Sequence, residues 1–140
     1  MGNENLGYTS KFSGMGFDAV IDRTTEALKS QGFGVITEID VKATMRKKLD
    51  VDFRNYQILG ACNPGFAHKA LSQDLAVGLL LPCNAVVYEE DDGDVVVSFV
   101  KPSEMFKVMA APELAGLADE VDESIRQVHL RLQEFGATAG

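Results

Sequence analysis

The residues of this 140-residue chain best suited to chemistry are its two cysteines, each of which has an asparagine directly after it and a proline beside the pair. Each pair follows a short apolar run, at 58–61 and 79–81, that is typical of a strand. If the two strands are neighbours, their thiols and amides can converge on one spot and bind a small ligand or an ion. The two segments are Cys62-Asn63-Pro64 and Pro82-Cys83-Asn84.

Cys62 is the better placed of the two thiols. Asn is a favoured N-cap and Pro a favoured first helical residue, so Asn63-Pro64 predicts a helix that begins directly after Cys62. The unpaired N–H groups and the positive end of that helix would stabilise a thiolate and bind an anion or polar group. The alternative is that both thiols are small buried hydrophobic side chains, as free cysteines usually are.

A histidine follows on the same predicted helix. His68 offers a base for Cys62, which would make the protein a thiol enzyme, although a lone histidine on a short helix is more often a surface residue. Zinc would need His68 or His129 as further ligands, and the cysteine spacing matches no zinc motif, so we assign no metal site. A disulfide between the two cysteines would require Cα atoms within about 7 Å. The sequence does not tell which cofactor, if any, the protein uses.

A second constellation lies in the segment 38–42. In an extended strand Glu38, Asp40 and Lys42 face the same way, and two carboxylates beside an ammonium can shift one another's pKa and perform acid–base chemistry. Glu38 or Lys42 would then also be candidates to assist Cys62. The alternative, which we favour, is a solvated strand face with weak ion pairs. The chain has no phosphate-binding glycine loop, dinucleotide fingerprint, H-E-x-x-H motif or nucleophile elbow.

Hydropathy patterning and turn residues predict the elements that position these groups. Asp92-Gly93 between two valine-rich runs is a strong hairpin signal, and Gly32 marks the end of the first helix. The predicted strands are 6–12, 33–41, 56–62, 85–90 and 95–100, and the predicted helices are 17–28, 42–49 (one or two turns), 64–73, 102–109 and 112–135. The chain reads as one domain, with a core at about 6–135, and residues 1–5 and 136–140 are expected to fray.

The last predicted helix carries a narrow apolar stripe. Its members are spaced alternately by four and three residues, which is a heptad pattern. The simpler interpretation is a long helix lying across the sheet, and the alternative is a helix that also meets a partner subunit. The stripe consists of Leu114, Ala118, Val121, Ile125, Val128, Leu132 and Phe135.

Composition limits the partners. A formal net charge of −8 and an isoelectric point near 4.7 argue against general binding to nucleic acid or to anionic membranes. Apolar runs such as 79–81 are far too short to span a bilayer, and the first twelve residues lack a secretory signal. Two cysteines without such a signal fit a reducing cytoplasm, where thiols stay free.

Four stretches, Gly32-Phe33-Gly34-Val35, 38–42, 56–64 and 80–84, resemble the domain of unknown function 302 family, in order from about residue 12 to 135. This resemblance implies an α+β fold similar to that of the TATA-box-binding protein: an antiparallel sheet with helices packed on one side, including a long C-terminal helix, assembled as a homodimer. It implies no reaction. The residues that carry the family pattern are Glu38, Asp40, Lys42, Cys62, Asn63, Pro64, Pro82, Cys83 and Asn84.

Three functional hypotheses follow. The first is a homodimeric module that binds a small ligand or ion, or responds to redox state, through the two Cys-Asn corners. In this hypothesis Asn63 and Asn84 cap and orient, while Cys62 and Cys83 are soft ligands or reversible redox centres. The second is a thiol-dependent enzyme that uses Cys62. The third is a structural interaction domain with inert thiols, in which the final helix is the dimer face.

Overall fold

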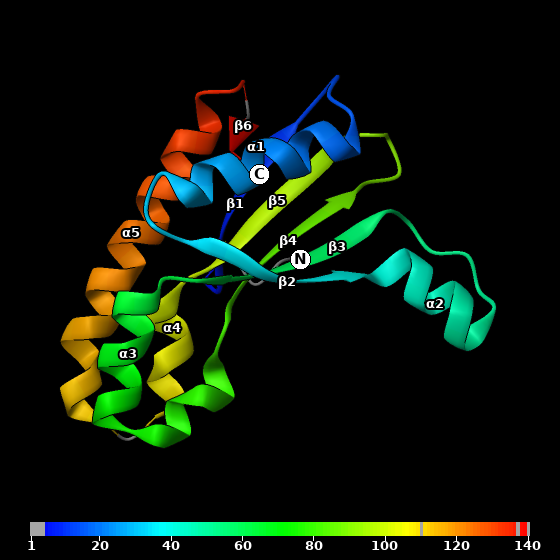
Figure 1. The fold of residues 1–140 in the computed structure, drawn as a ribbon. Helices are drawn as coiled ribbons and strands as arrows, with labels where there is room; N and C mark the ends of the chain where they lie inside the picture. Colours follow the sequence, from blue (N-terminus) through cyan, green and yellow to red (C-terminus); the bar gives the residue numbers. More distant parts are fainter. Residues whose placement is uncertain (1–4, 110, 137, 140) are drawn as a thin grey trace.

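The computed structural model describes residues 5–109, 111–136 and 138–139, and its centre is one antiparallel sheet (Figure 1). The strand order is β2-β3-β4-β5-β1-β6, and every pairing in it is antiparallel. The α+β class that the sequence predicts is therefore confirmed. The strands are β1 Gly7–Phe12, β2 Gly34–Asp40, β3 Tyr56–Cys62, β4 Cys83–Glu89, β5 Val95–Val100 and the short β6 Thr138–Ala139.

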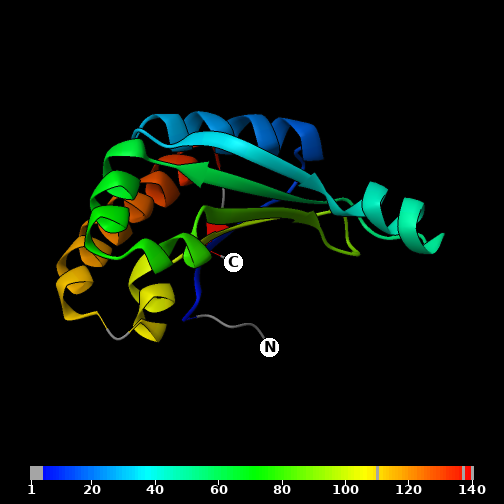
Figure 2. The ribbon, with the colours of Figure 1, turned by 60° about the horizontal axis from the view of Figure 1, so that its bottom comes forward.

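The helices form three groups around the sheet. Helices α1 and α5 pack on one face, α3 and α4 lie at one end of the sheet beside α5, and α2 projects beyond the opposite end (Figures 1 and 2). The helices are α1 Phe17–Lys29, α2 Val41–Leu49, α3 Pro64–Gln73, α4 Pro102–Met105 and α5 Ala115–Gln133, and the 3-10 helices are η1 Leu75–Leu80, η2 Phe106–Val108 and η3 Pro112–Leu114.

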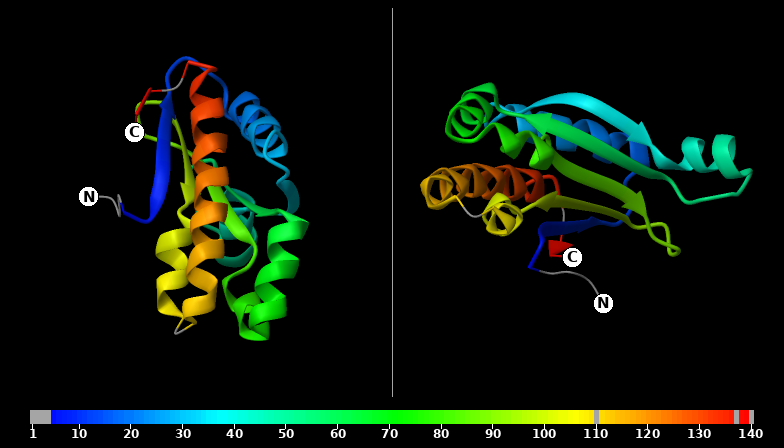
Figure 3. Two further views of the ribbon diagram at one scale, coloured as in Figure 1. Left: turned by 90° about the vertical axis from the view of Figure 1, so that its left-hand side faces the viewer. Right: turned by 90° about the horizontal axis from the view of Figure 1, so that it is seen from below.

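The main core forms where α1 and α5 meet the sheet (Figure 3). On each helix the apolar residues recur every three or four positions, so they share one face and are buried together. The stripe on the C-terminal helix belongs to this intramolecular packing: Ile125 is only 2% exposed. Leu114, Ala118, Val121, Ile125, Val128 and Leu132 are buried within the chain, so these residues are not available to a partner subunit. That the final helix also meets a partner stays a prediction.

Two elements differ from the sequence prediction near the site. The apolar run 79–81 lies mostly in η1, a 3-10 helix, and not in a strand. The Asp74 carboxylate accepts a hydrogen bond from the Ala76 amide at 2.9 Å and so starts that helix. As a result, the second Cys-Asn pair lies at the beginning of a strand, whereas the first lies at the end of one. Periodicity could not separate the two cases, because an apolar run of three residues fits either.

At the chain ends, residues 1–4, 137 and 140 lie outside the described residues. Thr138 and Ala139 pair with Lys11 and Ser10 of β1 as strand β6. No helix among the described residues has the length and apolar content required to cross a membrane.

Candidate functional site

The sheet register brings the two Cys-Asn corners together. Cys83 is the direct partner of Ala61, and Asn84 is the partner of Gly60, so the end of β3 lies beside the start of β4. Cys62 follows Ala61 at the last position of β3. The segments 62–64 and 82–84, which are far apart in the sequence, therefore lie side by side at one end of the sheet, next to the N-terminus of α3.

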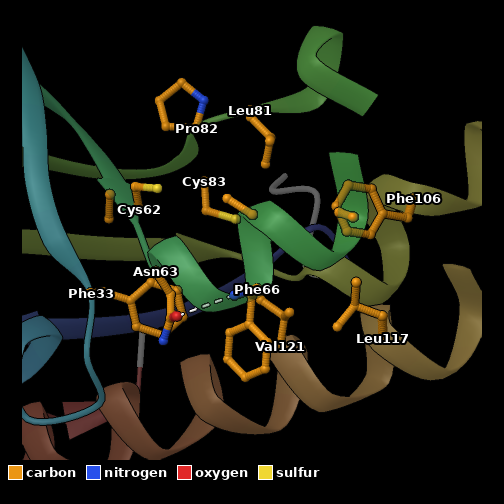
Figure 4. A pocket seen from close by; sticks show the side chains of 13 residues that line it. Phe33, Cys62, Asn63, Phe66, Leu81, Pro82, Cys83, Phe106, Leu117 and Val121 are labelled. Atoms are coloured by element: carbon orange, nitrogen blue, oxygen red, sulfur yellow. Dashed lines mark hydrogen bonds between the residues drawn. The ribbon is translucent and has the colours of Figure 1, made fainter. Parts of the chain in front are cut away.

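Both thiols line a small cavity between these strand ends and helices α3 and α5, which we call the thiol cavity (Figure 4). Its volume is about 30 Å³, enough for one water-sized group and too little for an organic ligand. Apart from the thiols and Asn63, its lining is apolar: Phe33, Ala61, Phe66, Ala67, Ala70, Leu81, Pro82, Phe106, Leu117 and Val121.

The two thiols differ in exposure. Cys83 is 7% exposed, whereas Cys62 is partly exposed, and both are free. Burial raises the pKa of the Cys83 thiol to about 11, and the neighbouring Cys62 thiol adds to this increase. At neutral pH Cys83 is therefore an uncharged thiol and a poor nucleophile.

Asn63 caps α3, as its sequence position predicts. Its Oδ1 accepts a hydrogen bond from the Phe66 amide at 3.3 Å, and its Nδ2 donates to the Gln31 carbonyl at 3.4 Å. Pro64 is the first helical residue. The cap fixes the end of β3, and with it Cys62, against the turn that precedes β2.

Asn84 has a different position. It is an exposed residue inside β4, and no helix starts there, so the prediction that it caps a second boundary is wrong. Cys83 and Asn84 are consecutive strand residues and so point to opposite faces of the sheet. Only the thiol of this pair lines the cavity.

Gly60 allows two side chains to pack closely over β3 next to the site. A Cβ atom on Gly60 would lie 2.1 Å from Thr37 Oγ1 and 2.8 Å from Pro82 Cγ. Only glycine at this position allows both side chains to pack over β3. The packing of Pro82 over the strand in turn helps to hold Cys83 beside the end of β3.

Residues 8–132 match the model of a family described as a domain of unknown function, DUF302. The chain belongs to this family. It is also similar to the crystal structure of an uncharacterized conserved protein DUF302 from Bacillus stearothermophilus, at 33% sequence identity and a TM-score of 0.82. That match covers 91% of this chain and 98% of the other. Among curated proteins, none matches the chain.

His68 does not join the thiols in this DUF302 protein. It is exposed on α3 and is not among the residues that line the thiol cavity. Its carbonyl accepts a hydrogen bond from the Ser72 hydroxyl at 2.7 Å, a contact within the helix. The predicted pairing of His68 with Cys62 as base and nucleophile is therefore not formed.

The constellation predicted at 38–42 is also not formed. Asp40 ends β2 and caps α2 by accepting a hydrogen bond from the Ala43 amide at 2.9 Å. Lys42 consequently lies in a helix, where its ammonium donates to the Phe53 carbonyl at 2.9 Å. Glu38 remains in the strand and accepts a hydrogen bond from Gln57 at 2.8 Å. All three are exposed, and each serves local structure.

Sequence reasoning missed a polar cluster centred on the buried carboxylate of Asp122. The Tyr8 hydroxyl donates to one oxygen of Asp122, and the Ser103 hydroxyl and amide donate to the other at 2.5 and 3.1 Å. Burial, followed by the interaction with Asp122, raises the pKa of Tyr8 to about 12. These residues are far apart in the sequence, so no local pattern could have indicated them.

His129 extends this cluster. Its ring stacks on Tyr8 with 5.5 Å between centroids, and its Nδ1 lies 3.2 Å from the Ser10 hydroxyl. Burial lowers the pKa of His129, and the cations Arg126 and Lys101 lower it further. Among the described residues no buried side-chain nitrogen or oxygen lacks a hydrogen-bond partner. The cluster therefore ties β1, α4 and α5 together as a satisfied structural network.

Proposed function

We propose that this DUF302 protein is a binding module that holds a single soft metal ion, typified by Cu(I), between Cys62 and Cys83. The observation that carries the proposal is that Cys62 and Cys83, at adjoining ends of neighbouring strands, both line the same small, mostly apolar cavity. A cavity of about 30 Å³ suits one ion better than an organic molecule.

The donor set decides the class of ion. No histidine or carboxylate lines the thiol cavity, so the donors are two sulfurs. Soft thiolate ligands select ions such as Cu(I), whereas structural zinc takes four ligands and Ca²⁺ or Mg²⁺ takes oxygen ligands. Within the described part of the chain, the one group of three acidic, histidine or cysteine ligands lies elsewhere, at Glu90, Asp92 and Asp94.

Proton release follows from this chemistry. Each protonated thiol that binds Cu(I) as a thiolate releases its proton, and no electron is transferred. Because burial raises the pKa of Cys83 to about 11, protons compete strongly for that sulfur at neutral pH. Affinity should therefore increase as the pH rises, by up to about tenfold per pH unit for each thiol that loses its proton.

The same observations bear on the other hypotheses. A thiol enzyme needs a base near its nucleophile, and none lines the cavity, so we do not extend the proposal to catalysis.

We infer in addition that the module is a homodimer, as the sequence predicts. Since the stripe on α5 is buried within the chain, the dimer has to use a different surface.

The experiment is an anaerobic titration of the reduced protein with Cu(I) in the presence of a competing chelator. We expect one ion per chain, ultraviolet absorption from thiolate-to-copper charge transfer, and protection of both thiols from a charged alkylating reagent. Cys62→Ser and Cys83→Ser should each abolish tight binding while circular dichroism shows an unchanged fold, and His68→Ala should bind normally. Tight binding that survives both cysteine substitutions would contradict the proposal, as would the absence of binding to the wild-type protein.

A further inference from the structure

One segment of the chain stands apart from the core. Residues 41–55, which we call the arm, contain α2 and extend beyond the sheet (Figures 1 and 2). No residue of α2 is buried. Val41, Met45 and Leu49 recur at four-residue spacing on one side of the helix, and Leu49 is 66% exposed. Val41 and Met45 are partly buried, so Leu49 is the exposed member of this side. A nine-residue helix is marginally stable alone, and further cover of this side would stabilise it.

A group of aromatic rings joins the end of the arm to the sheet. Val51 and Phe53 are exposed, and the Phe53 ring lies 6.3 Å from that of Tyr56. Tyr56 stacks on Tyr88 of the neighbouring strand, with 5.3 Å between centroids. Single exposed apolar residues are ordinary, but a connected group of this kind is typical of an interaction surface.

The arm is also basic. Its helix carries Lys42, Arg46, Lys47 and Lys48, and Arg46 forms ion pairs with Asp50 and Asp52 of the same arm. Among the described residues, Lys47 and Lys48 form no ion pair. The arm therefore carries excess positive charge on a chain whose net charge is −8.

Residues 89–94, which are the last residue of β4 and the turn between β4 and β5, are called the acidic turn; they lie at the same end of the molecule as the arm (Figures 1 and 3). Arg54 and Lys11 neutralise only part of it, through ion pairs of 3.1 Å to Asp91 and 2.7 Å to Glu90. Carboxylate oxygens of Glu90, Asp92 and Asp94 all lie within 4.8 Å of one another, so their repulsion favours a cationic partner. The acidic residues of the turn are Glu89, Glu90, Asp91, Asp92 and Asp94.

We propose that a second copy of this chain covers the arm, with a two-fold axis that places each basic arm against the acidic turn of its partner. This inference rests on the proposed homodimer and identifies its surface. A two-fold interface requires a self-complementary surface, and the basic arm and acidic turn at one end of the molecule provide it. The contact also buries the apolar side of α2. It counters the general repulsion between two chains of like net charge.

The test is sedimentation equilibrium of the full chain at low and high salt, with paired charge reversals. Lys47→Glu/Lys48→Glu and Asp92→Lys/Asp94→Lys should each weaken dimerisation by about tenfold or more at low salt, and less at high salt. An equimolar mixture of the two variants should dimerise like the wild-type protein, because the mixed dimer restores both contacts. The matched control is Lys29→Glu/Lys69→Glu, which makes the same change as Lys47→Glu/Lys48→Glu in net charge elsewhere, at exposed lysines, and should have little effect.

Leu49→Asp provides a second readout that does not depend on the charge pairs. Because Leu49 is 66% exposed, this variant should fold normally and dimerise about tenfold or more weakly. A wild-type protein that remains monomeric would contradict both the homodimer and its surface. A dimer that none of these variants weakens, or a mixture that fails to recover, would contradict the surface alone. None of these outcomes affects the Cu(I) titration, so failure of the ion site is observed separately.

Discussion

The alkaline titration of Cys83 provides a quantitative test of its environment. Burial raises the pKa of the Cys83 thiol from 9.0 to about 11, which means that the folded state favours the neutral thiol. The resulting stabilisation is fully present below about pH 9 and is lost as the pH rises through 11, because the unfolded chain ionises first. The free energy of unfolding should fall by about 1.3 kcal/mol between about pH 8 and pH 10, and by roughly 3 kcal/mol when the loss is complete.

Urea unfolding of the reduced protein at several pH values measures this loss, with Cys83→Ala as the reference. Below about pH 9 the variant should be less stable than the wild-type protein by a constant amount. Above that pH the difference should shrink as the wild-type protein loses the contribution of Cys83, and this change isolates Cys83. Tyr8, whose pKa is also raised, contributes equally to both and cancels. In parallel, the ultraviolet absorbance of the Cys83 thiolate, taken as the difference between the wild-type protein and Cys83→Ala, should appear near pH 11. Equal pH dependence in the two proteins, or a buried thiol that titrates near pH 9, would refute the reasoning.

Four further substitutions test the packing around the site and the polar cluster, each by urea unfolding. Gly60→Ala should destabilise by about 1–3 kcal/mol, since its Cβ would meet Thr37 Oγ1 at 2.1 Å, and a neutral result would show that the wall is loosely packed. Asn63→Ala should cost about 1 kcal/mol through loss of the α3 cap, whereas Asn84→Ala should cost little; equal effects would contradict the different roles assigned to the two asparagines. Tyr8→Phe leaves Asp122 without one donor and should cost about 1–3 kcal/mol, and an unchanged stability would show that this hydrogen bond contributes nothing net.

Local sequence signals predicted the elements that they encode directly. Asn63 and Pro64 specify the start of α3, and Asp92-Gly93 specifies the turn between β4 and β5, so both elements lie close to their expected bounds. The family resemblance and the class of fold are confirmed by the family match and by the sheet.

Other features depend on information that a local pattern does not contain. The alternation of side chains predicts that Asp40 lies within a strand, but its carboxylate can also cap a helix. In the structure it caps α2, so the strand ends at Asp40 and Lys42 lies in the helix and not on the strand face. Asn84 resembles Asn63 in sequence, but the antiparallel register turns it away from the thiol cavity. The contact of Tyr8 with Asp122 joins residues 114 positions apart, and only the complete topology brings them together.

X-ray absorption at the copper edge of the Cu(I)-loaded protein tests the central claim most directly, because it reports which atoms surround the ion. The structure predicts two sulfur neighbours and no nitrogen or oxygen ligand from histidine or carboxylate, with copper lost from the Cys62→Ser and Cys83→Ser proteins. Copper surrounded by nitrogen or oxygen, or retained without either cysteine, would contradict the assignment of the thiol cavity as a site for a soft ion.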